Sequence, residues 1–207
     1  MTGRSSITCG LAAAVCALSL SGCAAPVQTT EAESDLARFV VREIPETAHR
    51  EFIDFGGKIE LVAYELTPDG RAGPGQSVQA KFYWKPVSVI GPGWGLFTHV
   101  EDARGRQLRN LDEEGPLRKW IVGKTPRGLG SLDLANVYVD EQSFEMPKAE
   151  DLTPEVLLVV GVWNGDMRLP VVSGPSDGHH AGLVARIQTG LPWPKVATRR
   201  EEKEVRR

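Results

Sequence analysis

His99 is the side chain best suited to acid–base chemistry, because imidazole titrates nearest to neutral pH. It lies in the segment Phe97-Thr98-His99-Val100-Glu101-Asp102, and Asp112 follows nearby. A histidine beside a carboxylate could serve a hydrolytic site or a metal site. Alternation along a strand places His99 on the face opposite Thr98 and Val100. We therefore expect a structural histidine that hydrogen-bonds across a loop, with the hydrolytic site as the alternative.

The other polar motifs select no catalytic or metal site. His179-His180 is a loop pair without a third histidine or cysteine close in sequence, and His49 stands among polar residues. Adjacent side chains rarely face one metal ion, so we expect no metal and no cofactor. Val172-Ser173-Gly174 lacks the first glycine of a nucleophile elbow, and no His-Glu-x-x-His motif or phosphate-binding loop is present. The scattered carboxylates suggest no glycosidase pair: Asp102, Asp112, Asp133, Asp140 and Asp166.

The five tryptophans are the candidates for ligand contact. An exposed indole stacks on the flat face of a sugar, whereas a buried one contributes about 150–250 Å² to a core. Trp84 and Trp163 end strongly apolar strands, and we expect both in the core. Trp94 lies between glycines and Trp120 lies in a Lys-Trp-Ile segment, so these two are the predicted exposed indoles. With His99, they are the candidate ligand-binding residues.

The only residue with a definite chemical fate is Cys23, in Leu20-Ser21-Gly22-Cys23. These four residues close a short apolar run and resemble the lipobox of bacterial lipoproteins. The resemblance implies that the signal peptide, residues 1–22, is cleaved before Cys23, that the thiol receives a diacylglyceryl group, and that the new amine is acylated (palmitate). Ala24 in place of aspartate favours the outer over the inner membrane. The alternative is an ordinary cleavable signal with an incidental cysteine.

Composition limits the possible partners and compartments. Cys9 and Cys16 leave with the signal and Cys23 is lipidated, so the mature chain has no disulfide and no thiolate site. The formal net charge is −3, which gives no reason to expect a nucleic-acid partner. About 140 residues remain for one domain, enough to bury roughly 68–70% of the unfolded surface in a core.

The chain divides into short terminal segments around one domain. Residues 23–30 form the predicted lipidated spacer. Thr30-Glu31-Ala32-Glu33 is typical of a capping box, and apolar residues at helical spacing follow it, so we predict a short helix over 31–44 that packs on the domain. The domain spans residues 52–190. The charged segment 195–207 is predicted to be disordered.

From residue 56 onward, short β-branched and aromatic runs alternate with Gly, Pro and Asp, which is typical of an antiparallel sandwich or barrel. Turns are predicted at Pro68-Asp69-Gly70 and Gly73-Pro74-Gly75. We predict seven to eight strands and a loop-like stretch over 106–130. The predicted strands include 58–66, 77–84, 94–102, 131–141, 155–163, 168–172 and 183–189.

The order of several motifs resembles a known kind of envelope domain. The residues are Gly57 to Leu66, Phe82-Tyr83-Trp84, Phe97-Thr98-His99-Val100, and Arg168-Leu169-Pro170-Val171. They are similar to the extracytoplasmic β-sandwich domains of bacterial protein-mannosyltransferase-type membrane glycosyltransferases. The resemblance covers roughly residues 57–189 and implies an accessory module with a carbohydrate-binding-like fold.

The prediction is therefore an all-β protein: an antiparallel β-sandwich, Ig-like or carbohydrate-binding-like, with a short N-terminal helix. It is expected to be a non-enzymatic envelope lipoprotein, held to the membrane by the lipid on Cys23, that binds a glycan or an envelope protein. Two alternatives stay open. One is a purely structural or assembly lipoprotein, and the other is an envelope polysaccharide hydrolase acting through His99 and a carboxylate.

Overall fold

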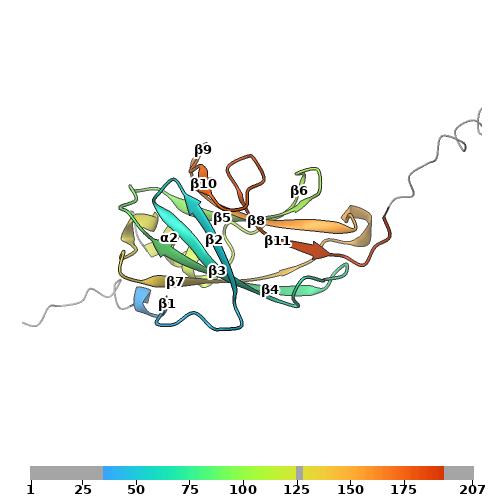
Figure 1. Cartoon of the computed structure of the whole chain (residues 1–207), viewed down its shortest axis with the longest axis horizontal. Coiled ribbons are helices and arrows are strands. Elements are labelled where there is room, and N and C mark those ends of the chain that lie inside the picture. Colours follow the sequence, from blue (N-terminus) through green and yellow to red (C-terminus); the bar gives the residue numbers. More distant parts are fainter. Residues whose placement is uncertain (1–34, 125–127, 194–207) are drawn as a thin grey trace, which may run out of the picture.

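The computed structural model describes residues 35–124 and 128–193 (Figure 1). The predicted signal peptide 1–22, the spacer 23–30 with Cys23, and the charged segment 195–207 lie outside the described residues. In the part that is described, no helix is long and apolar enough to cross a membrane.

The fold is all-β and antiparallel, as predicted, and it is built from two sheets. The six-stranded sheet has the order β1-β7-β4-β3-β2-β10 and the other sheet has the order β11-β8-β5-β6, with the short β9 paired to β8. The bounds are β1 Val40–Val41, β2 His49–Phe55, β3 Ile59–Thr67, β4 Ser77–Pro86, β5 Gly95–Asp102, β6 Gln107–Asn110, β7 Val137–Glu145, β8 Glu155–Asn164, β9 Met167–Arg168, β10 Val171–Ser173 and β11 Gly182–Gln188.

The core lies between the two sheets because alternate residues of each long strand are apolar. In β3, Ile59 and Leu61 are fully buried, and in β4 Phe82 and Trp84 are fully buried. They share one hydrophobic cluster with Val156, Leu158, Val160 and Val162 of β8. Side chains two residues apart point to the same face of a strand, so β8 directs its other face away from this core.

The strand number differs from the prediction. The described residues form eleven strands rather than seven to eight, but only seven of the eleven have seven or more residues. The short ones extend the edges of the two sheets or close a hairpin. They carry too few residues to show alternation in the sequence.

The predicted helix over 31–44 is wrong in its extent. Its first residues lie outside the described part, residues 35–37 are helical, and a turn then leads into β1. Leu36 and Phe39 are buried in the main core, so the apolar positions do pack on the domain. Val40 and Val41 instead form a strand that pairs with Tyr138 and Val137 of β7. The edge of a sheet has unpaired backbone N–H and C=O groups, and β1 supplies hydrogen-bond partners for them.

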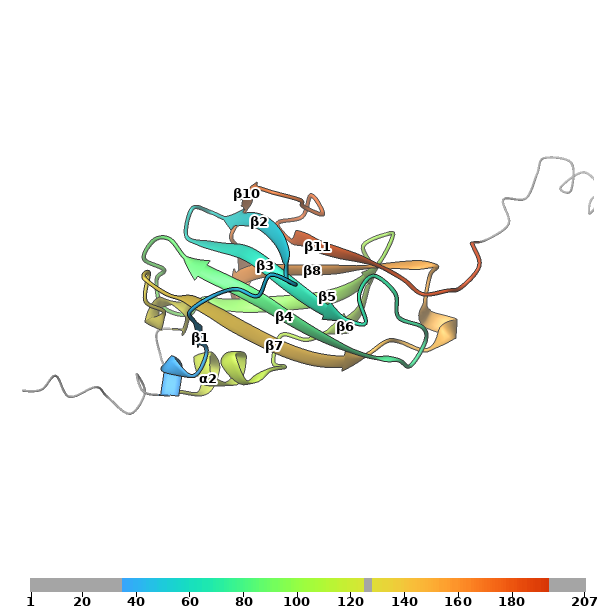
Figure 2. The same ribbon diagram turned by 60° about the horizontal axis from the view of Figure 1, so that its bottom comes forward.

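Residues 106–124 and 128–130 are also more ordered than the predicted loop. This part of the chain contains β6, helix α2 over Pro116–Lys124 and a 3-10 turn, η1, over Gly128–Ser131. Gly115 has a φ of +86° and Pro116 is the first residue of α2, a position where its missing N–H costs nothing. Gly115-Pro116 thus starts a helix where the sequence suggested only a break. Figure 2 shows α2 beside β7.

Candidate functional site

The outer face of the second sheet carries a row of aromatic and polar side chains. Phe97 and His99 of β5 point away from the main core, since Leu96 and Val100 point into it. Trp163 of β8 pairs with Gly95 of β5, and Phe97 pairs with Gly161 of β8. A Cβ on Gly161 would lie 2.3 Å from the Phe97 ring. The two glycines thus leave room for the rings to lie across the neighbouring strand.

Two adjoining cavities open beside this row. The first, of about 800 Å³, lies among the β4–β5 loop, the loop after β6, and α2. The second, of about 270 Å³, lies among Phe97, His99 and the β8–β9 turn. Asp112 and Trp163 line both cavities. A cavity of several hundred Å³ with aromatic walls and a few polar groups is the usual form of a small-ligand site.

Trp94 forms one wall of the first cavity and is half-buried. Its carbonyl accepts a hydrogen bond from the Leu129 N–H at 2.9 Å, which ties it to η1. Gly128 has a φ of +58°, and a Cβ there would lie 2.4 Å from the Trp94 carbonyl oxygen. Only glycine permits this close approach, so Gly128 fixes the position of Trp94.

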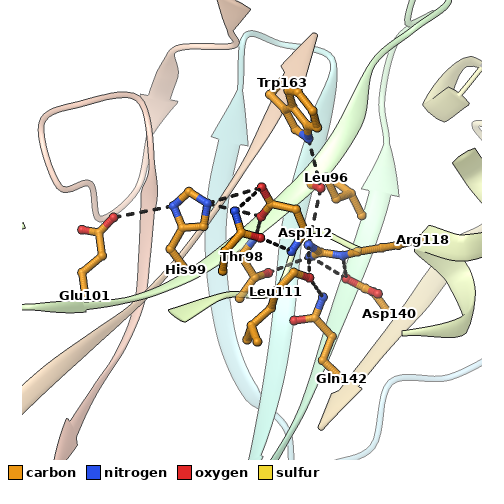
Figure 3. Close-up of polar contacts among 11 residues, drawn as sticks. Leu96, Thr98, His99, Glu101, Leu111, Asp112, Arg118, Asp140, Gln142 and Trp163 are labelled. Carbon is orange, nitrogen blue, oxygen red and sulfur yellow. Dashed lines mark hydrogen bonds and ion pairs between the residues drawn. The ribbon is translucent and has the colours of Figure 1, made fainter. Parts of the chain in front are cut away.

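Trp163 forms the wall between the two cavities and is 38% exposed. Its Nε1 donates to the carbonyl oxygen of Leu96 at 3.3 Å (Figure 3). This hydrogen bond satisfies the polar atom of the indole while a large part of the ring remains in solvent. An exposed, oriented indole is the group that stacks on the apolar face of a ligand.

His99 lies between two carboxylates (Figure 3). Its Nε2 is 3.2 Å from Asp112 Oδ1 and its Nδ1 is 3.8 Å from Glu101 Oε1. The ring also packs on Phe97, with centroids 5.0 Å apart. Both ring nitrogens therefore face groups of the protein itself, and the predicted hydrogen bond of His99 across a loop is confirmed.

Asp112 is held by three donors. Its carboxylate accepts from the Thr98 N–H at 3.1 Å, from Asn110 Nδ2 at 3.0 Å, and faces His99 Nε2. Burial raises the pKa of the Asp112 carboxyl, but the hydrogen bond and charge of His99, with the other two donors, outweigh it and leave the pKa below its usual value. Asp112 is thus an ionised, fixed acceptor shared by both cavities.

Glu101 is a buried carboxyl on the same face of β5. Burial raises its pKa above the usual value and the charge of Asp177 adds to this, while His99 and Arg168 oppose it. Arg168 does not form a close pair with Glu101; its guanidinium lies 4.5 Å from the centroid of the Phe97 ring and donates to the His179 carbonyl at 3.4 Å.

A buried arginine joins the elements around the first cavity. Arg118 of α2 is 2% exposed and its Nε donates to Asp140 Oδ2 of β7 at 2.9 Å. Nη2 donates to Thr98 Oγ1 at 2.6 Å, and Nη1 lies within 3.4 Å of the carbonyl oxygens of Leu96 and Leu111 (Figure 3). One guanidinium thereby links α2 to β5, β7 and the loop that carries Asp112.

The structure separates the tryptophans differently from the prediction. Trp84 is fully buried, as predicted, but Trp163 is exposed rather than in the core. The predicted exposure of Trp120 is wrong: its side chain is 4% exposed because it lies on the face of α2 that packs against the core. Of the three candidate ligand-binding residues, Trp94 lines the first cavity, His99 lines the second, and Trp120 lines neither.

Asp166 lines the second cavity, whereas the other three histidines line neither cavity. His179 and His180 are exposed in the β10–β11 loop, and His49 pairs with Asp69 at 2.9 Å on the surface. No group of three or more His, Cys, Asp or Glu side chains within 35–124 and 128–193 is placed to hold a metal ion.

Sequence reasoning missed Trp163 and Arg118 as parts of the site. Both faces of β8 are apolar, so alternation alone did not show which face Trp163 occupies. Arg118 lies in the stretch that lacked any regular pattern.

No protein-family model matches this chain, and no curated protein is significantly similar to it.

Proposed function

We propose that this protein is a lipid-anchored envelope protein that binds a glycan, without catalysis, in the cavities beside Trp94 and Trp163. The antiparallel fold is then a sandwich of the Ig-like or carbohydrate-binding-like type. The lipid on Cys23 holds it to a membrane, and the outer membrane is the proposed location. Cys23 and Asp35 are twelve positions apart in the sequence. That length of chain spans at most about 40 Å when fully extended, which would keep the domain near the bilayer.

The observation that carries the proposal is the lining of the first cavity. It combines two indoles, Trp94 and Trp163, with the acceptors Asn110, Asp112, Glu113 and Glu114. A pyranose ring has flat faces of C–H groups and a rim of hydroxyls. Indoles match the faces, and carboxylate and amide oxygens accept hydrogen bonds from the hydroxyls. Its volume of about 800 Å³ suits an oligosaccharide of a few residues.

The arrangement of His99 supports binding rather than hydrolysis. A general base needs a nitrogen within hydrogen-bond reach of the substrate. His99 is only 6% exposed, with Nε2 at 3.2 Å from Asp112 and Nδ1 at 3.8 Å from Glu101, so little of the imidazole is open to a substrate. Asp112 in turn has three donors within the protein. These groups stiffen the wall of the cavities and hold Asp112 as an acceptor.

The binding proposal is tested by titrating the full chain, purified in detergent, with neutral and charged oligosaccharides in a calorimeter. The variants are Trp163→Ala and Trp94→Ala, and the matched control is Trp193→Ala. Trp193 is 64% exposed and lines neither cavity. If a fully exposed indole presents about 250 Å², the open part of Trp163 is roughly 90 Å², whose burial is worth about 2 kcal/mol.

We expect affinity to fall at least about tenfold in Trp163→Ala, which is the Kd equivalent of about 1.4 kcal/mol. Trp94→Ala should act in the same direction and Trp193→Ala should bind normally. Absence of binding to every oligosaccharide, or an equal loss in Trp193→Ala, would overturn the proposed site.

The anchor is tested independently by Cys23→Ala. Cells grown with an alkyne-labelled fatty acid should label the native chain and not the variant, and the variant should leave the membrane fraction. An ordinary signal with an incidental cysteine predicts no acyl label on either protein.

A further inference from the structure

The first cavity has two indole walls and carries an excess of negative charge. Trp94 and Trp163 line it together with Asp112, Glu113 and Glu114. Among the described residues of the lining, Arg118 is the one cationic side chain, and it forms an ion pair with Asp140 at 2.9 Å. Asp140 is fully buried and is not part of the lining. The charge of Arg118 is thus compensated by a carboxylate behind the wall rather than by the three carboxylates of the lining.

The carboxylates of Glu113 and Glu114 have no partner among the described side chains. Both residues are exposed, in the loop between β6 and α2. Asp112, beside them, has a pKa that its donors, led by His99, hold below the usual value in spite of burial. Three adjacent carboxylates therefore face the cavity or its mouth, and among the described residues of the lining the one cation, Arg118, is already paired with Asp140.

This combination selects by charge. An anionic ligand such as a uronic acid would meet like charges at short range. A neutral glycan would gain the stacking on the indoles and hydrogen bonds alone. A ligand with an ammonium group gains these and two further interactions: the attraction of the carboxylates, and the attraction of a cation to the face of an indole.

We propose that the ligand is an amino-sugar oligosaccharide with free, protonated amines. The inference rests on the proposed glycan-binding function and specifies its ligand class. Trp94 and Trp163 pack against the sugar faces, and Glu113 and Glu114 pair with the ammonium groups. Asp112 accepts from a hydroxyl or from an ammonium group with the lone pair that its protein donors leave free.

The test compares three oligosaccharides of equal length at mildly acidic pH and low salt. They are a β-1,4-linked glucosamine oligomer, its fully N-acetylated form, and a β-1,4-linked glucuronic acid oligomer. Each is titrated into the full chain in detergent. We expect the free-amine oligomer to bind about tenfold more tightly than the acetylated one, and the acidic oligomer to bind weakest. Raising the salt concentration should reduce the first affinity most.

The variant for this test is Glu113→Gln/Glu114→Gln, which keeps the shape of both side chains. It should weaken binding of the free-amine oligomer by about threefold to tenfold and leave the acetylated oligomer unchanged. The matched control is Glu150→Gln, which removes a carboxylate that is exposed in η2, over Ala149–Asp151, and lines neither cavity. It should leave both affinities unchanged.

The outcomes separate this inference from the proposed function. Equal binding of the free-amine and acetylated oligomers would overturn the inference while glycan binding stands, as would the tightest binding by the acidic oligomer. An equal loss for both oligomers in the double variant would show that the glutamates act only as hydrogen-bond acceptors, and would also overturn it. Absence of binding to all three would refute the glycan-binding function itself.

Discussion

Replacing Arg118 with methionine should cost more stability than any other single change on the wall of the first cavity. Methionine keeps the length of the side chain and removes its charge. The change leaves Asp140, which is fully buried, without its ion pair. It also removes the donors to Thr98 Oγ1 and to the carbonyl oxygens of Leu96 and Leu111.

The expected loss follows from the burial of both partners. Breaking a buried ion pair by removing one member typically costs about 3–5 kcal/mol, because an unpaired charge stays in the interior. A domain of this size loses roughly 2–4 °C in Tm for each kcal/mol. We therefore expect Arg118→Met to lower Tm by about 6–20 °C, and to lower the urea midpoint by roughly 2 M.

The assay is urea unfolding followed by circular dichroism and tryptophan fluorescence. The control is the cycle of Arg118→Met, Asp140→Leu and the double variant. With both charges removed, the double variant should be more stable than the two single losses predict by addition, because no unpaired charge remains. A cost below about 1 kcal/mol for Arg118→Met, or additive losses in the double variant, would refute the role of Arg118 as a buried link between α2 and the sheets.

Three further predictions concern single residues of the site. Burial raises the pKa of Glu101 above 4.5, so its contribution to stability is fully present below pH 4.5 and is lost as pH rises through the raised value. Glu101→Gln should therefore have a higher Tm than the native protein at neutral pH and an equal Tm below pH 4.5. A lower Tm of the variant at neutral pH would contradict the burial of this charge. The pKa of Asp112 is held below its usual 3.8, so its contribution to stability is present above pH 3.8 and is lost as pH falls through the lowered value. Asp112→Asn should therefore have a lower Tm than the native protein at neutral pH and the same Tm in acid. A difference in Tm that is independent of pH would show that the charge is not involved. Gly128→Ala should cost about 3 kcal/mol or more in chemical unfolding, because a Cβ meets the Trp94 carbonyl; Gly165→Ala, at the same φ of +58° with nothing within 4 Å, should cost only about 1 kcal/mol, and equal costs would mean that Gly128 serves its turn and not the cavity.

The strands of the two sheets were largely predictable, because each sheet packs one face against the shared core and this leaves a pattern of apolar residues in the sequence. Alternation in 58–66 and 77–84 corresponds to β3 and β4, and the apolar run 155–163 corresponds to β8. What failed was local. α2 begins at Pro116 after a glycine, and such a pair indicates a loop unless the tertiary partner of the helix is known. β1 is too short to have a pattern of its own.

The site was less predictable because it is formed by residues far apart in the chain. Trp163 and Gly95 meet only through the β5–β8 pairing, and the exposure of Trp163 depends on that register. Trp94 lies between two glycines and Trp120 follows a lysine, so neither sequence context indicates a core residue. Only the packing of α2 on the core separates the buried indole from the one at the cavity. Asp112 could be suspected from its proximity to His99, but its three donors come from tertiary structure.

The most direct test of ligand binding at this site is the nuclear magnetic resonance spectrum of the tryptophan indole N–H groups during an oligosaccharide titration of the full chain in detergent. The chain has five tryptophans and therefore five such signals. If a glycan binds in the cavities, the signals of Trp94 and Trp163 should shift and saturate together, while those of Trp84, Trp120 and Trp193 stay in place. Shifts confined to Trp193, or no shift at a concentration that saturates the protein in the calorimeter, would contradict binding at this site.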